Sequence, residues 1–235
     1  MSFQSTTLTE SNLDETQSLP ILAIDPGTSE SALVTLLPDG TPAEGCPNAI
    51  FENDTLLSFL SESNRAICNR GGVCCDMVIE RMQGMGQRVG QEVFDTVFWS
   101  GRFAQAWSGG VYLIDRRDVK VHICGHARST DADVRGHLIM MFGGTKDVAV
   151  GRKASQGPLY GFKSHMWQAL GLGVTFLHWR VMQTADDADD AADDADDDDD
   201  TADDAAANAA AAAADDDDAA ADDDGRTDPP EPPDE

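Results

Sequence analysis

The stretch PILAIDPGTSESALVTLL, residues 20–37, has the pattern of two β-strands joined by a tight turn. A short apolar run ends in Asp25, strong turn formers follow at Pro26-Gly27-Thr28, and an apolar, β-branched run begins at Ser31. The pattern therefore places a carboxylate at the tip of a buried strand. An ionised carboxylate there is costly unless it is paired, hydrogen-bonded or bound to a cation. Taken alone, Asp25 is equally well interpreted as a functional group or as a cap that bonds the turn amides.

A second buried strand with the same ending supports the functional interpretation. Residues 75–80, CDMVIE, form an apolar run that ends in an acid, and the Gly-rich sequence RMQGMGQRVG follows it. Two buried strands are thus expected to deliver Asp25 and Glu80 to one edge of one sheet. Converging carboxylates on rigid strands suit a hard divalent cation such as Mg²⁺, which prefers oxygen ligands and keeps several waters for substrate.

The chain between and after these strands predicts an alternation of helices and strands. A third antiparallel strand is expected within residues 41–50, although its two prolines weaken that expectation. Asn53 is expected to cap a helix that ends near the Gly71-Gly72 pair. Residues 111–114 have the pattern of another short strand, with charged residues at its end.

The remaining helices are predicted from their apolar periodicity. A helix over about residues 90–107 has a broad apolar stripe that core packing explains; its members are Val93, Phe94, Val97, Phe98, Ala104 and Trp107. Thr130 is expected to cap a helix over residues 131–142, and the Gly-rich, basic residues 143–161 are expected to form a mobile surface loop. A last helix over about residues 164–182 closes the fold, with Trp167, Leu170, Val174 and Leu177 on its apolar side.

The net charge of −27 is concentrated near the C-terminus. Residues 185–235 hold 24 of the 43 acids and one Arg, so residues 1–184 have a net charge of only −4. The tail is mostly Asp and Ala, and such dense like charges repel one another while little apolar surface is available to bury. We therefore expect disorder over residues 185–235 and over the polar residues 1–19, with one folded domain over residues 20–184.

The cysteines and the hydropathy pattern bear on location. Five cysteines form no CxxC pair, and no charged start followed by an apolar signal segment is present, so free thiols and a cytoplasmic protein are expected, in the host cytoplasm if the gene is viral. No apolar run approaches the ~20 residues that span a bilayer, so no membrane partner is expected.

Four motifs, in this order, resemble a RuvC-type Holliday junction endonuclease of the RNase H-like superfamily, in its phage form. They are IDPGT at residues 24–28 with a strand after it, VIE at residues 78–80, VK followed by four residues and Gly at residues 119–125, and HMWQALGLGVTF from His165. The resemblance implies an α/β fold with an RNase H-like mixed sheet, in which three antiparallel strands are followed by parallel strands and helices cover both faces. The activity it implies is structure-specific, divalent-metal-dependent hydrolysis of phosphodiesters in Holliday junctions or other branched DNA.

The same resemblance assigns the site residue by residue. Asp25, Glu80 and His165 match the catalytic metal ligands, and Mg²⁺ is the implied cofactor, with Mn²⁺ expected to substitute for it. Gln168 matches the second ligand position of the last helix. It departs from the family pattern because a neutral amide offers an oxygen but supplies less charge.

A second departure occurs at Asp131, where the family usually has a Lys. Either Asp131 or Asp133 could supply the charge missing at Gln168; the alternative is that both are first-turn acids favoured by the helix dipole. The Lys120 position matches the family. Candidate DNA-binding residues are Lys120, Arg81, Arg88, Arg117, Arg128 and Lys163.

Three functions remain open on the sequence. The first is a homodimeric endonuclease, since a two-fold protein presents two sites to the two equivalent strands of a four-way junction. The resemblance places the helix over residues 90–107 near the dimer interface, so its wide apolar stripe could serve both the core and that interface. The second is a junction-binding protein of the same fold with weakened or lost cleavage, as Gln168 and Asp131 suggest. The third is an actin-like or sugar-kinase phosphate-binding domain, which IDPGT also resembles, but which needs two lobes and a second phosphate motif.

Overall fold

A computed structural model describes residues 19–193 except 71, 73 and 85–87. The segments expected to be disordered, residues 1–19 and 185–235, lie almost wholly outside the residues whose side chains are described. Two compact units divide at Asp186, and the first of them contains the sheet and its covering helices. No helix in the described part of the chain combines the length and the apolar character needed to cross a bilayer.

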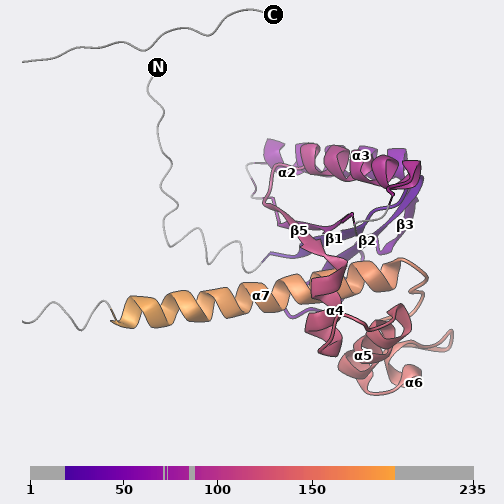
Figure 1. Cartoon of the computed structure of the whole chain (residues 1–235), viewed down its shortest axis with the longest axis vertical. Helices are drawn as coiled ribbons and strands as arrows, with labels where there is room; N and C mark the ends of the chain where they lie inside the picture. Colours follow the sequence, from indigo (N-terminus) through magenta and orange to yellow (C-terminus); the bar gives the residue numbers. More distant parts are fainter. Residues whose placement is uncertain (1–18, 71, 73, 85–87, 194–235) are drawn as a thin grey trace, which may run out of the picture. The chain divides into compact units, whose positions relative to one another are not determined.

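The centre of the fold is a five-stranded mixed sheet (Figure 1). Its strands are β1 (Ile21–Asp25), β2 (Glu30–Leu36), β3 (Ala49–Glu52), β4 (Met77–Arg81) and β5 (Val111–Asp115), in the order β3-β2-β1-β4-β5. Strands β1, β2 and β3 pair antiparallel, whereas β4 pairs parallel with both β1 and β5. The sequence predicts this mixed sheet, in which three antiparallel strands are followed by parallel strands. The third strand comes later than expected, because β3 begins at Ala49.

Alternation along the strands divides the core into two layers. On β1, Ile21 and Ala23 pack in one cluster and Leu22 and Ile24 in the other, as expected when successive side chains of a strand point to opposite faces. The first cluster lies against α7 (Met166–Asp193), and the second lies against α2 (Asn53–Asn69) and α3 (Gln91–Gln105). Helices therefore cover both faces of the sheet (Figure 1).

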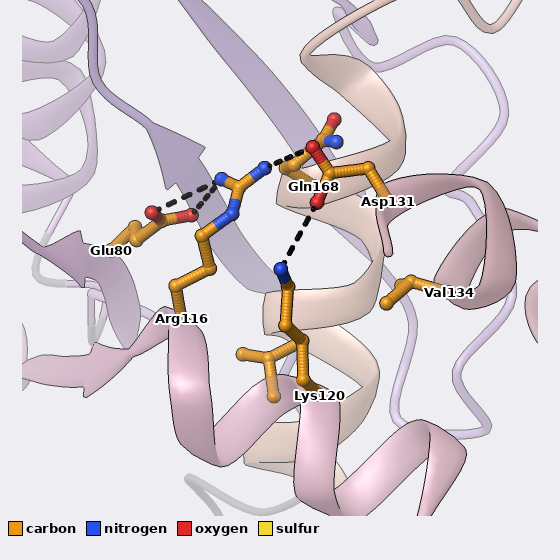
Figure 2. Close-up of a pocket in the computed structure, with 7 residues that line it drawn as sticks. Glu80, Arg116, Lys120, Asp131, Val134 and Gln168 are labelled. Carbon is orange, nitrogen blue, oxygen red and sulfur yellow. Dashed lines mark hydrogen bonds and ion pairs between the residues drawn. The ribbon is translucent and has the colours of Figure 1, made fainter. Parts of the chain in front are cut away.

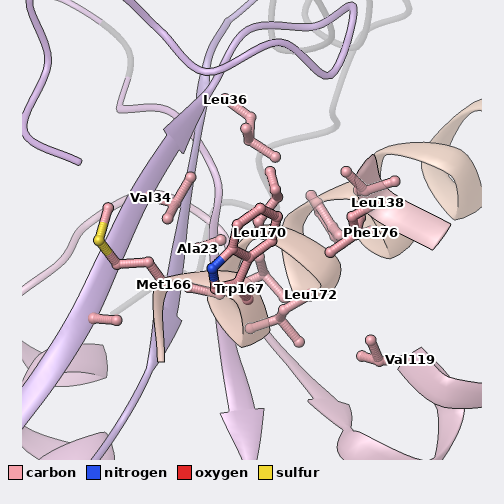
Figure 3. Packing of buried hydrophobic residues seen from close by; sticks show 14 of the residues in the cluster. Ala23, Val34, Leu36, Val119, Leu138, Met166, Trp167, Leu170, Leu172 and Phe176 are labelled. Carbon is pink, nitrogen blue, oxygen red and sulfur yellow. The ribbon is translucent and has the colours of Figure 1, made fainter. Parts of the chain in front are cut away.

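The long helix α7 lies close to the sheet (Figure 3). A Cβ at Gly173 would come within 2.6 Å of Leu36 and 3.0 Å of Ala23, so glycine permits the helix to approach the strands. The predicted apolar side of α7 is buried: its residues Trp167, Leu170, Val174 and Leu177 belong to the core. The helix begins two residues later than expected and continues past residue 182.

Three shorter helices lie on the α7 side: α4 (Arg116–Cys124), α5 (Asp131–Gly143) and α6 (Lys146–Ala149). Thr130 caps α5 as predicted, in a reciprocal capping box with Asp133.

The expectation of a mobile surface loop over residues 143–161 is wrong. This segment contains α6 and a hairpin of β6 (Gly151–Arg152) and β7 (Ser155–Gln156), and its Ala149 and Leu159 are fully buried. The high glycine content favoured the prediction of a loop, whereas Ala149 and Leu159 pack this segment against the core.

The apolar stripe predicted on α3 is only partly in the core. Phe94 and Phe98 are each 61% exposed, and Val97 is 50% exposed. The buried face instead follows Thr96 and Phe103. Because the apolar stripe is wide, the sequence does not decide which face of the helix is buried. The structure buries Phe103 completely.

Candidate active site

The turn after β1 is held by side chains from two other elements. The Gly27 amide donates to Ser31 Oγ at 3.1 Å, and this hydroxyl donates to Asn53 Oδ1 at 2.6 Å. Asn53 Nδ2 in turn donates to the Gly27 carbonyl at 3.0 Å. A Cβ at Gly27 would collide with the Glu30 carbonyl oxygen, so the tight turn requires glycine. These contacts fix where β1 ends and leave the carboxylate of Asp25 free of the turn.

Asn53 therefore has a different role from the one predicted. Glu52, rather than Asn53, is the N-cap residue of α2, and no side-chain hydrogen bond caps the helix. Asn53 is buried, and its amide satisfies polar groups of the β1–β2 turn. An Asn at the start of a predicted helix fits either role, a helix cap or a buried amide that bonds a neighbouring turn, so the sequence does not distinguish them.

Asp25 is 6% exposed and faces His165 across 3.0 Å, from Oδ2 to the imidazole Nδ1. His165 directly precedes α7, and Ser164 before it adopts a left-handed φ of 34°. Such backbone conformations are costly outside glycine and concentrate at functional sites. The hydrogen bond to Asp25 raises the pKa of His165, against the opposing effect of partial burial. The predicted ligands Asp25 and His165 are thus in direct contact.

Glu80 is the last of four consecutive buried residues of β4, lies on the same face of the sheet as Asp25 and is 7% exposed. Burial, followed by the negative charge of Asp25, raises the pKa of Glu80 to about 7, and Arg116 only partly offsets this. The two acids therefore interact at the adjacent carboxyl ends of β1 and β4. Their convergence is the geometry expected from the two strand patterns.

Arg116, at the start of α4, connects Glu80 to Asp131 (Figure 2). Its Nη1 donates to both carboxylate oxygens of Glu80 at 3.2 Å, and its Nη2 lies 2.8 Å from Asp131 Oδ2. Lys120 Nζ approaches the other oxygen of Asp131 at 3.5 Å. Partial burial acts to raise the pKa of Asp131, but Arg116 and Lys120 outweigh it and lower that pKa. The contact between Arg116 and Glu80 is not apparent in the sequence, where only the charge at the end of β5 is visible.

A small pocket lies between these groups and α7. Its lining includes Glu80, Arg116, Asp131 and Gln168 (Figure 2). The Oε1 atom of Gln168 is buried and has no hydrogen-bond partner in the described structure. Leaving a buried acceptor unpaired costs free energy, so this oxygen is available to a ligand or water. Asp133 lies apart from the pocket lining and bonds Thr130 in the capping box.

The donors present fit a hard divalent cation in kind. They comprise two buried carboxylates that repel each other and an unpartnered amide oxygen, which are the ligand types that Mg²⁺ and Mn²⁺ prefer. Among the described residues, however, no three His, Cys, Asp or Glu side chains are grouped as a ready metal shell. Glu80 is instead bonded to Arg116, and Asp25 to His165.

Two hollows flank the acids. One of about 480 Å³ is lined by Glu80, Arg81, Met82, Gln83, Arg116, Arg117, Lys120 and Ala127. The other, of about 350 Å³, lies between the β1–β2 turn, α3 and His165. Of the predicted DNA-binding residues, Arg81, Arg117 and Lys120 therefore border the site. Arg88, Arg128 and Lys163 are exposed but line neither hollow.

Arg81 is less free than its sequence position indicates. Its Nε and Nη2 donate to the Asp115 carboxylate at 2.5 and 2.8 Å, and Gln83 also donates to Asp115. This pairing lies on the opposite face of the sheet from the Glu80–Arg116 pair, because adjacent residues of β4 and of the β5–α4 junction point in opposite directions. The end of β4 and the β5–α4 junction thus each supply one acid and one base to two ion pairs.

Comparison with known proteins gives similarity in structure alone. No family model and no curated protein sequence matches the chain. Among solved structures, the chain is similar to RuvC of Thermus thermophilus and to the same protein in complex with a Holliday junction substrate. In both cases the identity is 14%, and the match covers 69% of this chain and 96% of the other. The TM-scores are 0.48 and 0.45.

Proposed function

We propose that the chain is a structure-specific endonuclease that hydrolyses phosphodiesters in Holliday junctions or other branched DNA with a bound divalent cation. The observation that carries this proposal is the convergence of Asp25 and Glu80, two buried acids on adjacent strand ends, where burial and the charge of Asp25 raise the pKa of Glu80. A cation between the two acids favours the ionised form of Glu80. The basic hollow beside Glu80 provides space and charge for a DNA phosphate.

Each residue at the site has a defined role in this proposal. Asp25 and Glu80 hold Mg²⁺, or Mn²⁺ in its place, and the Gln168 oxygen is a further neutral donor. The bound ion would supply Lewis-acid activation of the phosphodiester. His165 orients Asp25 through the 3.0 Å hydrogen bond, or binds the metal directly if the ring turns. Arg117 and Lys120 attract and position the phosphate backbone.

A homodimer is part of the proposal. The apolar surface of α3 made by Phe94, Val97 and Phe98 is exposed, since each of these side chains is at least half exposed. Exposed apolar patches of this kind often mark interfaces. A two-fold dimer would present two copies of the site to the two equivalent strands of a junction.

Nicking of a synthetic four-way junction tests the function. The wild-type chain should cut symmetrically with Mg²⁺ or Mn²⁺ and lose activity with a chelator, while Asp25→Asn and Glu80→Gln should each abolish cleavage. Both substitutions keep side-chain volume and remove a charged ligand, so circular dichroism and thermal unfolding should remain close to wild type. Near wild-type nicking by either variant at saturating Mg²⁺ would show that the metal site is assigned wrongly.

A junction-binding protein with weakened cleavage is the second candidate. Two observations favour it: Gln168 is neutral, and Arg116 donates hydrogen bonds to both carboxylate oxygens of Glu80. Junction binding without nicking, measured with the same substrate, would select it over the nuclease. The kinase-like alternative requires a second lobe, whereas the described residues form one five-stranded sheet and a two-stranded hairpin.

A further inference from the structure

Arg116 contacts both of the carboxylate oxygens with which Glu80 would hold a cation. A single guanidinium nitrogen contacts both carboxylate oxygens of Glu80 at 3.2 Å. In the part of the chain that the structure describes, this is the only ion pair that Glu80 makes. A divalent cation and a guanidinium are both positive, so they repel each other when both lie at these two oxygens. The Arg116 contact therefore opposes metal binding at Glu80, and its release favours metal binding.

A second anionic partner for Arg116 already exists. Nη2 lies 2.8 Å from Asp131, which is closer than Nη1 lies to Glu80. Asp131 is in the first turn of α5, a helix whose start is fixed by the Thr130–Asp133 capping box. Lys120 contacts the other Asp131 oxygen, so the carboxylate is oriented from both sides. Rotation about the Arg116 side chain can therefore break the Glu80 contact while the Asp131 contact is kept.

The geometry points to Arg116 as an internal competitor for the metal, with Asp131 as the acceptor that retains the guanidinium when it leaves Glu80. This role rests on the proposed metal site and adds a control step to it. In the metal-free chain, Arg116 neutralises Glu80 and limits the repulsion between Glu80 and Asp25. When metal is bound, Arg116 remains beside Asp131, at the edge of the basic hollow and within reach of a DNA phosphate.

Mn²⁺ binding to the metal-free full-length chain, followed by the paramagnetic resonance signal of free Mn²⁺, measures the competition directly. Arg116→Met should tighten Mn²⁺ binding by about tenfold, because one charge-assisted contact no longer has to be broken. Arg117→Met removes the same charge from the neighbouring position, which does not touch Glu80. It should change the affinity much less. Equal affinities of wild type and Arg116→Met would overturn the competition.

Asp131→Asn should act in the opposite direction and weaken Mn²⁺ binding, because the displaced guanidinium has lost its acceptor. Loss of a positive or a negative charge near the metal would by itself also tighten or weaken Mn²⁺ binding. The double variant therefore decides between competition by Arg116 and such long-range electrostatic effects. If Arg116 is the competitor, Asp131→Asn should have little effect once Arg116 is Met; purely long-range effects would add. Additive effects would overturn the role of Asp131.

Two outcomes separate this inference from the proposed function. Unchanged junction nicking with no effect of Arg116→Met on Mn²⁺ affinity overturns the competition and leaves the nuclease standing. Tightened Mn²⁺ binding in a chain that nicks no junction supports the competition and overturns the nuclease. Arg116→Lys keeps the charge but cannot bridge both acids, and its affinity should lie between wild type and Arg116→Met. It serves as the test if Arg116→Met does not fold.

Discussion

At the residue scale, the site consists of buried polar groups with few partners. Asp25 has His165, Glu80 has Arg116, and the oxygen of Gln168 has none among the described residues. Such groups are expensive to bury, and the fold gains no obvious packing from them. Substitution of each of these side chains, one at a time, therefore tests its role in cleavage, metal binding or stability.

His165→Ala should reduce junction cleavage by about 10- to 100-fold, as loss of a residue that orients a metal ligand commonly does. The substitution removes the 3.0 Å contact to Asp25 without disturbing the core, because His165 is an exposed residue ahead of α7. Initial nicking rates at saturating DNA measure the effect. His178→Ala, on α7 and away from the site, is the control. Equal rates for wild type and His165→Ala would remove His165 from the site.

Gln168→Met should stabilise the metal-free protein by about 1 kcal/mol, since it replaces a buried, unpaired amide oxygen with an apolar group of similar size. The same variant should show a smaller increase in melting temperature on addition of Mn²⁺, because a donor has been lost. Thermal unfolding with and without Mn²⁺ measures both effects. An unchanged Mn²⁺ response would show that Gln168 is not a metal ligand.

At the scale of elements, the strands were predictable because their burial follows simple rules. β1 and β4 are apolar runs closed by an acid, and parallel pairing places those acids at the same edge of the sheet. The arrangement around Arg116 could not be predicted in this way. It depends on α4 and α5 approaching each other beside β4, and no local pattern encodes that approach. The same limit explains the wrong expectations for Asn53 and for residues 143–161, and the fact that only part of the α3 stripe lies in the core.

Asn53→Ala should destabilise the protein by about 2–3 kcal/mol, because Ser31 Oγ and the Gly27 carbonyl lose their buried partner. Loosening of the β1–β2 turn should also slow cleavage, since that turn fixes the end of β1 beside Asp25. Urea unfolding measures the first effect. Asn69→Ala, at the exposed other end of α2, should stay within about 0.5 kcal/mol of wild type.

At the scale of the whole molecule, the charge is divided very unevenly. Residues 194–235 contain 19 of the 43 acids, whereas the candidate site is bordered by arginines and Lys120. In the proposed function the folded part binds DNA, and a polyanion in the same chain is always present at high local concentration, so it would compete with phosphates for the same basic side chains. The alternative is that this acidic segment contributes only solubility.

Deletion of residues 194–235 should tighten binding to non-specific duplex at low salt, and the difference should shrink as salt screens the charges. Fluorescence anisotropy of the full-length and truncated chains at two salt concentrations measures it. Equal affinities at low salt would leave solubility as the role of the acidic segment.

The two ion pairs between the end of β4 and the β5–α4 junction restrict how the gene can vary. Glu80 is paired with Arg116 and Arg81 with Asp115. A shift of β5 by one residue against β4 would place Glu80 opposite Asp115 and Arg81 opposite Arg116, two like-charged pairs at once. Insertions and deletions should therefore be absent from the codons for residues 111–116 in related genes, even where the surrounding sequence has diverged widely.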